Sequence, residues 1–324
     1  MIKLGIRVAN SIVSGRGHFE RCFSISNYFS NKVLWFLDEK NEFYETRIKD
    51  KDEIIYEEEV SKVSAMVKAI NEDKINIILL DSYNIDINSI SKSFKNIPLC
   101  VFQDTDKLLK AHMIICPHPI EINKNKGAII LCGPSFAPIS SKFIYNKSVK
   151  KDHNINLLIS MGAYDSAGIT LNIIKSIKKL SEKIEEKINI KIVLGKGSPT
   201  INKINNLIKN DSNYDLLVNV NDMTEIYNNS SIAIGAPGLS HMERLYFGIP
   251  TILIAQNNIH ESIIDKWVNI GCALKSVNTI SMIEKKLLYI IENRNIRNNL
   301  IQNGRNLVDG KGALRIAKAM LKIV

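Results

Sequence analysis

The chain has little of what marks secreted or membrane-bound proteins. Its 324 residues include only five cysteines, an odd number, and these are widely spaced in apolar segments. We therefore expect buried thiols rather than disulfides or zinc ligands. The five are Cys22, Cys100, Cys116, Cys132 and Cys272. No apolar run approaches the length of a membrane span, and the first residues lack the long apolar region and the cleavage site of a signal peptide, so we expect a cytoplasmic protein.

The chain also lacks a basic arm and the aromatic signature of RNA-binding proteins. Its formal net charge is nevertheless +10, which favours an anionic ligand such as a nucleotide diphosphate. The lysines are scattered among abundant isoleucine and asparagine, as is typical of a solvated surface. We therefore expect a small anionic substrate and no nucleic-acid partner.

Short apolar runs alternate with helical patterns along the whole chain, which is the β-α-β rhythm of a parallel sheet covered on both faces. The length favours two domains of about 150 residues each. A polar stretch rich in Lys, Ser and Asn, residues 140–154, predicts the linker. We therefore expect an α/β protein with two Rossmann-like, doubly wound domains, at residues 1–145 and 146–324. Before the linker, strands are predicted at 2–9, 33–37, 75–80, 99–102 and 113–116, and a helix at 61–70.

The same rhythm continues after the linker. Strands are predicted at 155–161, 188–194, 216–220, 232–234 and 251–255, and helices at 171–180 and 242–247. The segment from Ser281 onward, broken near Gly304 and Gly310, predicts two or three helices. Two such domains leave a cleft between the carboxyl edges of their sheets, and one of these last helices is a candidate to pack back across it.

The loop after the first predicted strand is the most informative stretch. It reads Ser14-Gly15-Arg16-Gly17-His18. Two glycines let the backbone bend sharply and let a ligand approach closely, and a histidine stands where a helix begins. Since ligands of α/β proteins bind at the carboxyl ends of strands, this loop is a candidate site. A tight connection with a satisfied polar histidine is the alternative that the spacing leaves open.

A second glycine turn, Gly235-Ala-Pro-Gly238, also follows a predicted strand and opens a helix that contains Ser240 and Glu243. Amides at a helix start, together with the helix dipole, suit a phosphate group. A carboxylate one turn into the helix can accept hydrogen bonds from ribose hydroxyls. A capped helix with an exposed carboxylate is the alternative interpretation.

A third loop of this kind, with Gly162 and Asp165, follows the first strand of the second domain. It is either a site loop or a turn with an aspartate cap, because aspartate is also a preferred residue at a helix N-cap. The three glycine-bearing turns lie in both predicted domains. We expect all three to face one interdomain cleft.

No metal centre is predicted. The spacing His18-Phe-Glu20 occurs in zinc deaminases, but their Pro-Cys-x-x-Cys partner is absent. The other histidines show no metal-ligand spacing, and we interpret them as structural, with attention to His241 because it adjoins Ser240. They are His112, His118, His153, His241 and His260. We expect neither a metal nor a cofactor.

The run from Gly15 to Cys22 resembles the Gly-x-Gly-His-x-x-Arg-Cys signature of the PseG family, the UDP-sugar hydrolases of pseudaminic acid biosynthesis, which are relatives of MurG-type glycosyltransferases. The likeness extends in order over nearly the whole chain. Further matches are Asp81, Tyr83, Asp104, Gly133, Gly162, Asp165 and the run Gly235-Ala-Pro-Gly-Leu-Ser-His-Met-Glu-Arg244 followed by Gly248-Ile-Pro250.

The resemblance implies a GT-B fold and a metal-independent hydrolysis that releases UDP and a free deoxy-diacetamido sugar. It implies that His18 is the base that takes a proton from the attacking water. UDP would be held mainly by the second domain, at Gly235, Gly238, Ser240 and Glu243. The substrate would also contact Gly15, Gly17, Arg21, Asp81, Tyr83, Gly162, Asp165, Asn257 and Asn258.

The chain departs from the family pattern at two places. Gly162 is followed by Ala163 where two glycines are common, and Asn257 by Asn258 where glutamine is common. Both departures imply a reshaped sugar pocket. Two other functions remain open: a glycosyltransferase, which needs an acceptor groove, and a non-catalytic nucleotide-sugar-binding protein, which needs no base. For any of these we expect a UDP-sugar ligand and a monomer or weak dimer.

Overall fold

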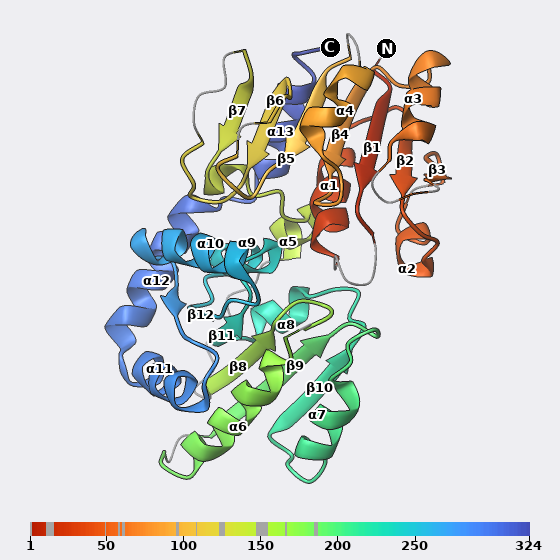
Figure 1. Ribbon diagram of the computed structural model, residues 1–324. Helices are drawn as coiled ribbons and strands as arrows, with labels where there is room; N and C mark the ends of the chain where they lie inside the picture. The colour runs from red at the N-terminus through yellow and green to blue at the C-terminus, as the bar shows by residue number, and fades with distance from the viewer. Residues whose placement is uncertain are drawn as a thin grey trace. The chain divides into compact units, whose positions relative to one another are not determined.

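The computed structural model describes residues 2–10, 16–48, 50–57, 59, 62–94, 97–107, 109–122, 127–146, 155–165, 167–184 and 187–324. The chain divides into two compact units. The first comprises Met1–Ser140 together with Gly310–Val324, and the second comprises Ser141–Asp309. Each unit is built around one parallel sheet (Figure 1).

The first unit contains a seven-stranded sheet. Its strands are β1 (Leu4–Val8), β2 (Val33–Leu37), β3 (Glu53–Tyr56), β4 (Ile77–Asp81), β5 (Leu99–Phe102), β6 (Met113–Cys116) and β7 (Ile129–Cys132). Their order is β3-β2-β1-β4-β5-β6-β7. Every residue of β1, β2 and β4 is buried, as expected where helices cover both faces of a parallel sheet. Val8 pairs with Asp81, so β1 and β4 end side by side.

Helices cover both faces of this sheet. They are α1 (Gly17–Ser26), α2 (Glu42–Glu45), α3 (Ser64–Asn71), α4 (Ile87–Ile90), the short 3-10 helices η1 (Ser91–Phe94) and η2 (Pro134–Phe136), and α13 (Gly312–Met320). On one face Phe19 of α1 and Ile316 of α13 share a core with Ile6. On the other face Met66 of α3 packs with Phe36. Figure 1 shows α13, in blue, among the red and yellow elements of this unit.

The second unit contains a six-stranded sheet in the order β10-β9-β8-β11-β12-β13. Its strands are β8 (Ile155–Ser160), β9 (Ile188–Leu194), β10 (Tyr214–Val218), β11 (Ile232–Gly235), β12 (Thr251–Leu253) and β13 (Leu274–Lys275). Its helices are α5 (Ser141–Asn146), α6 (Ile169–Ser181), α7 (Ile201–Ile208), α8 (Thr224–Asn228), α9 (Leu239–Phe247), α10 (Asn258–Asn269), α11 (Ile280–Glu292) and α12 (Arg294–Leu307). Ile159 of β8 shares a core with Ile173 of α6 and Leu287 of α11.

The predicted pair of doubly wound α/β domains is confirmed by these two sheets. The sequence analysis missed three strands. Two of them, β3 and β7, are the edge strands of the first sheet, and their side chains are only partly buried. The third, β13, has two residues and lies at an edge of the second sheet. In the described part of the chain, no helix is long and apolar enough to cross a membrane.

The C-terminal segment differs from the predicted organisation. Residues 310–324 belong to the first unit, because α13 packs on α1 and η2. Gly304 lies inside α12 and does not break a helix. A Cβ at Gly304 would come within 2.7 Å of Leu245, so this glycine allows α12 to pack closely on α9. The predicted linker begins with α5, and residues 147–154 lie outside the described residues.

Candidate active site

Polar side chains gather in the first unit where the order of the sheet reverses, between β1 and β4. Asp81 ends β4, Asp104 follows β5 and His118 follows β6, so three neighbouring strands bring polar residues to one edge. Helix α1, which follows β1, adds His18 and Arg21. In open parallel sheets the carboxyl ends at such a reversal leave room for a ligand.

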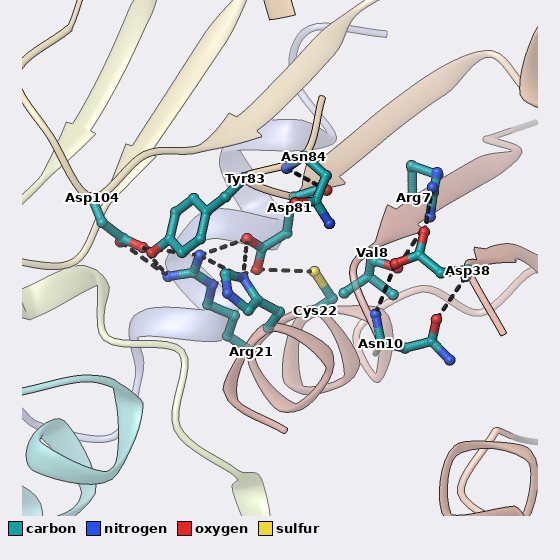
Figure 2. Close-up of polar contacts among 12 residues, drawn as sticks. Arg7, Val8, Asn10, Arg21, Cys22, Asp38, Asp81, Tyr83, Asn84 and Asp104 are labelled. Atoms are coloured by element: carbon teal, nitrogen blue, oxygen red, sulfur yellow. Dashed lines mark hydrogen bonds and ion pairs between the residues drawn. The ribbon is translucent and has the colours of Figure 1, made fainter. Parts of the chain in front are cut away.

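Arg21 joins two carboxylates from different strands (Figure 2). Its Nε and Nη2 donate to Asp81, with Nη2 at 2.5 Å from Oδ1. Its Nη1 donates to Asp104, at 3.0 Å from Oδ1 and 3.2 Å from Oδ2. The guanidinium also lies over Phe102, 4.3 Å from the ring centre. The planar donors of arginine suit two carboxylates at once, so Arg21 fixes α1 against the ends of β4 and β5.

His18 lies one helical turn before Arg21 and shares its partner Asp81. The His18 Nδ1 atom is 2.7 Å from Asp81 Oδ1. Since an ionised carboxylate only accepts hydrogen bonds, this contact assigns the proton of a neutral imidazole to Nδ1 and leaves Nε2 with a lone pair. Arg21 Nη2 lies 3.2 Å from the same Nδ1 atom and donates to Asp81. The ring of Tyr83 packs edge-on against the imidazole, with ring centres 4.8 Å apart. The His18 side chain is therefore oriented from two sides while 8% of the residue remains exposed.

Asp104 has two further partners besides Arg21. The Tyr83 hydroxyl donates to Oδ2, and His118 Nε2 lies 3.3 Å from Oδ1. Tyr83 is 59% exposed although its hydroxyl reaches this buried carboxylate, so its ring forms the accessible rim of the cluster. The sequence analysis interpreted His118 as structural and missed this contact. His118, like Asp104, comes directly after a predicted strand, and this position was the signal that indicated a site residue.

The buried cation of this cluster keeps its two carboxyls ionised. Burial opposes ionisation of Asp81 and Asp104, but Arg21, together with the neighbouring histidines, lowers the pKa of both carboxyls. Two carboxylates and one guanidinium therefore place one net negative charge beside the imidazole of His18, the residue that the resemblance implies is the base.

A separate ion pair anchors the end of β1. Arg7 is fully buried and pairs with Asp38. Asn10 accepts from the Asp38 amide at 2.6 Å and donates to the Glu39 carbonyl at 2.8 Å. Figure 2 shows Arg7, Asn10 and Asp38 together. These contacts hold the chain that leads toward Gly15, which lies outside the described residues; Gly17, the second predicted glycine, is the first residue of α1.

In the second unit, the sheet order reverses between β8 and β11, and the predicted nucleotide loop begins where β11 ends. Gly235 is the last residue of β11 and Gly238 is the N-cap residue of α9. Ser240 lies in the first turn of α9. The first amides of a helix have no partner within it, so this turn offers donors at the position where an α/β sheet accepts a ligand.

Glu243 lies one turn further along α9 and accepts a hydrogen bond from the Tyr227 hydroxyl at 2.6 Å. Burial, followed by the charge of Glu243, raises the pKa of Tyr227, so the phenol stays protonated and keeps donating. The sequence analysis missed Tyr227, because a buried tyrosine in a short helix resembles any core residue. His241 is fully buried and packs edge-on against Trp267, 4.9 Å between ring centres, so its ring lies in the core.

The other predicted substrate residues of this unit are Gly162, Asp165, Asn257 and Asn258, and two of them cap helices. Gly162 has φ +88°, a conformation that favours glycine. The Asp165 carboxylate accepts from two backbone amides in the first turn of α6, at 3.0 and 3.1 Å, so the cap interpretation accounts for both oxygens. The Asn257 side chain caps α10 by accepting from the backbone amide three residues later. Asn258 is the first residue of α10 and is exposed.

Residues 141–307 match the family described as Glycosyl transferases group 1. The matched region is more than half of the chain and includes the turn at Gly235 and the helix with Glu243. The chain belongs to the Glycosyl transferases group 1 family. Membership of the PseG family stays a prediction, since the match shows the broader family.

Two curated proteins are similar to this chain in sequence. Uncharacterized protein MJ1062 of Methanocaldococcus jannaschii is 22% identical over 354 residues, which is 99% of this chain and 66% of that protein. Spore coat polysaccharide biosynthesis protein SpsG of Bacillus subtilis is 26% identical over 173 residues, which is 52% of this chain and 50% of that protein. The chain therefore spans 66% and 50% of the lengths of the relatives it matches.

Solved structures share the fold along nearly the whole chain. MurG of Acinetobacter baumannii matches with a TM-score of 0.70 and 13% identity, over 99% of both chains. UDP-GlcNAc 2-epimerase of Neisseria meningitidis, solved with UDP-GlcNAc bound, matches with a TM-score of 0.67 and 15% identity, over 98% of this chain and 100% of that one. These matches confirm the predicted GT-B fold of two Rossmann-like domains.

Proposed function

We propose that the protein is a UDP-sugar hydrolase that releases UDP and a free deoxy-diacetamido sugar, on a route to pseudaminic acid or another nonulosonic acid. The observation that carries the proposal is the 2.7 Å hydrogen bond between His18 Nδ1 and Asp81, at the reversal point of the first sheet. It leaves the other ring nitrogen able to accept a proton from water.

In the proposed reaction a water molecule attacks the anomeric carbon. One water proton passes to Nε2 of His18, and the bond between the anomeric carbon and the diphosphate oxygen breaks, with its electron pair leaving on UDP. Asp81 orients the imidazole and stabilises the imidazolium that forms. Arg21 and Asp81 are too deeply buried, at 7% and 1% exposure, to be the main sugar contacts expected from the sequence, so we propose that they position His18.

The second unit supplies the nucleotide site in this proposal. The amides at the start of α9, around Gly238 and Ser240, would bind the diphosphate. Glu243, oriented by Tyr227, would accept hydrogen bonds from the ribose. This assignment is supported by the position of the turn at the reversal point of the second sheet and by the UDP-GlcNAc bound in the similar epimerase structure.

Removing the base tests the reaction. We expect His18→Ala to retain UDP binding but to lose hydrolysis by roughly two to four orders of magnitude, the range for a general base. The assay follows the anomeric proton by NMR over a panel of UDP- and CMP-sugars. His112→Ala is the matched control, because His112 accepts from the Leu99 amide at the opposite ends of the strands. Near-normal turnover of His18→Ala would exclude His18 as the base.

Removing the carboxylate of Glu243 tests the nucleotide site. In calorimetry, Glu243→Ala should bind UDP more weakly by at least about 1 kcal/mol, the scale of a hydrogen bond to a charged group. Tyr227→Phe, which removes only the hydroxyl that orients Glu243, should cause a smaller loss. Unchanged UDP affinity in a folded Glu243→Ala variant would remove Glu243 from the site.

A glycosyltransferase is the second candidate, and the family match over residues 141–307 is compatible with it. The two reactions differ in what attacks the anomeric carbon. A hydrolase yields the free sugar when the protein is incubated with the UDP-sugar alone. A transferase releases UDP at a substantial rate only when an acceptor hydroxyl compound is added, and its sugar product is a glycoside.

A further inference from the structure

A buried arginine lies directly behind the glycine turn of the second unit. Arg244 follows Glu243 on α9 and is 0% exposed. Its Nη2 donates to the Ala236 carbonyl at 2.7 Å, inside the turn. If Gly235 carried a Cβ, that atom would lie 2.7 Å from Arg244 Nη1 and 2.6 Å from the Ser160 carbonyl oxygen. Glycine at 235 therefore lets the guanidinium lie against the end of β11.

The positive charge of Arg244 is incompletely compensated within the protein. Among the described residues, Nε and Nη1 have no hydrogen-bond partner, and no carboxylate forms an ion pair with the guanidinium. Glu243 attracts the guanidinium only over a longer range, and it accepts a hydrogen bond from the protonated Tyr227 hydroxyl. Burial lowers the pKa of Arg244 to about 10, so it stays charged at neutral pH.

An unpaired buried charge costs several kcal/mol unless something else balances it. A structural role explains only one donor of Arg244, namely Nη2, which donates to the Ala236 carbonyl. The Arg244 charge lies behind the turn at the start of α9, where the helix amides already favour an anion. Because the guanidinium is buried, salt screens it little, and its electric field adds to that of the amides.

We propose that Arg244 is the buried counter-charge of a diphosphate bound at the turn from Gly235 to Ser240. It is a positioning residue that acts through the turn, without touching the ligand, and it makes the site prefer ligands of higher negative charge. This inference rests on the proposed nucleotide site of the second unit and names the group that sets its charge preference.

The test compares a charged ligand with a neutral ligand that shares its nucleoside. Calorimetry measures UDP, UMP and uridine binding to the wild-type protein and to Arg244→Gln, which can still donate to the Ala236 carbonyl but carries no charge. We expect UDP affinity to fall about tenfold to a hundredfold and uridine affinity to change less than twofold, with UMP between them. Arg244→Lys, which keeps the charge, should recover most of the UDP affinity.

Each outcome distinguishes an electrostatic role of Arg244 from a purely structural role. Equal losses for UDP and uridine, or unchanged UDP affinity in folded Arg244→Gln, would overturn the proposal. If Arg244→Gln does not fold, Arg244→Met carries the same comparison, because apolar replacement of a poorly paired buried charge is often tolerated. A wild-type protein that binds uridine but not UDP refutes Arg244 as counter-charge, whereas one that binds neither refutes the nucleotide site itself.

Discussion

At the scale of single residues, Arg21 is the central group of the first unit. It is the cation between Asp81 and Asp104, and both carboxylates are almost fully buried. Without it, two negative charges would share a poorly hydrated space, which costs several kcal/mol. Asp81 contacts both Arg21 and His18, so the ion pair also holds the carboxylate that orients the imidazole.

Replacing Asp81 by asparagine separates the charge of this residue from its shape. Asp81→Asn can still accept from His18 Nδ1, but it no longer stabilises the imidazolium, so we expect hydrolysis to fall by about 10²-fold to 10⁴-fold with little change in KM. Steady-state kinetics with the confirmed UDP-sugar measures both constants. Asp38→Asn, which weakens the ion pair with Arg7, is a comparison for general effects of a lost buried carboxylate. A KM that rises while kcat is kept would assign Asp81 to substrate binding.

The lowered pKa of Asp104 predicts how the stability of the first unit depends on pH. Burial raises the pKa of this carboxyl, but Arg21 and His118 outweigh it, and the pKa lies well below the ordinary value of 3.8. Because the folded-state pKa is lowered, the carboxylate stabilises the fold above about pH 4, and this contribution is lost as the pH falls through the folded-state pKa. We expect urea denaturation to show a smaller loss of stability on acidification for Asp104→Asn than for the wild type.

Tryptophan fluorescence can follow the urea denaturation of the first unit alone. The chain has two tryptophans, Trp35 in the first unit and Trp267 in the second. A Trp267→Phe background leaves Trp35 as the reporter. Parallel curves for wild type and Asp104→Asn between about pH 5 and pH 3 would show that the ion pair does not govern acid stability.

At the scale of elements, α13 completes the first unit after the chain has passed through the second. Its buried residues join the same core as α1, as Ile316 and Phe19 show. Arg315 adds a hydrogen bond to the Ser135 carbonyl at 2.8 Å. Helix α13 therefore contributes to the stability of the unit that carries His18.

The start of α13 is packed too closely for any side chain. A Cβ on Gly312 would lie 2.2 Å from the Ala137 carbonyl oxygen, which belongs to the backbone. Gly312→Ala should therefore destabilise the first unit by about 1–3 kcal/mol, although alanine is the better helix former. Thermal unfolding with the Trp35 reporter measures the effect. Gly238→Ala is the stability control, since no atom lies within 4 Å of its added Cβ, and an equal shift in both variants would contradict the packing argument.

At the scale of the whole molecule, the proposed chemistry divides between the two units, with the base on the first and the nucleotide turn on the second. The positive charge expected at the diphosphate comes from the amides of α9 and from Arg244. These groups supply part of the stabilisation that a divalent ion supplies in other enzymes.

Turnover should therefore survive dialysis against EDTA and should not respond to added magnesium. NMR assays before and after dialysis, with metal content measured in the same samples, test this expectation. Protein dialysed without chelator is the control. Loss of turnover that one divalent metal restores would overturn the proposed mechanism and would direct attention to the carboxylates Asp81, Asp104 and Asp165 as oxygen ligands.

Local sequence patterns determined much of the fold. A strand covered on both faces needs an almost continuous apolar run, so β2, β5 and β6 were predicted with their observed bounds. Strand β9, whose buried residues alternate with half-buried ones, was also predicted with its observed bounds. The glycine turn before α9 was also predictable, because a sharp bend between a strand and a helix favours glycine. The missed strands β3 and β7 are edge strands with one neighbour each. Strand β3 begins with a charged residue, whereas β7 was missed although Ile129–Cys132 is an apolar run.

The sequence by itself therefore determined the α/β class and the position of the glycine turn before α9, and it directed attention to His18. Only the tertiary structure decided which side chains act together, because strand order sets contacts between residues far apart in the chain. His18 and Asp81 are 63 positions apart and meet because β1 and β4 are neighbours. Packing between segments far apart in the chain also places α13 in the first unit. It likewise buries Arg244 behind the turn at Gly235, although the sequence shows this residue only as one of many charged residues.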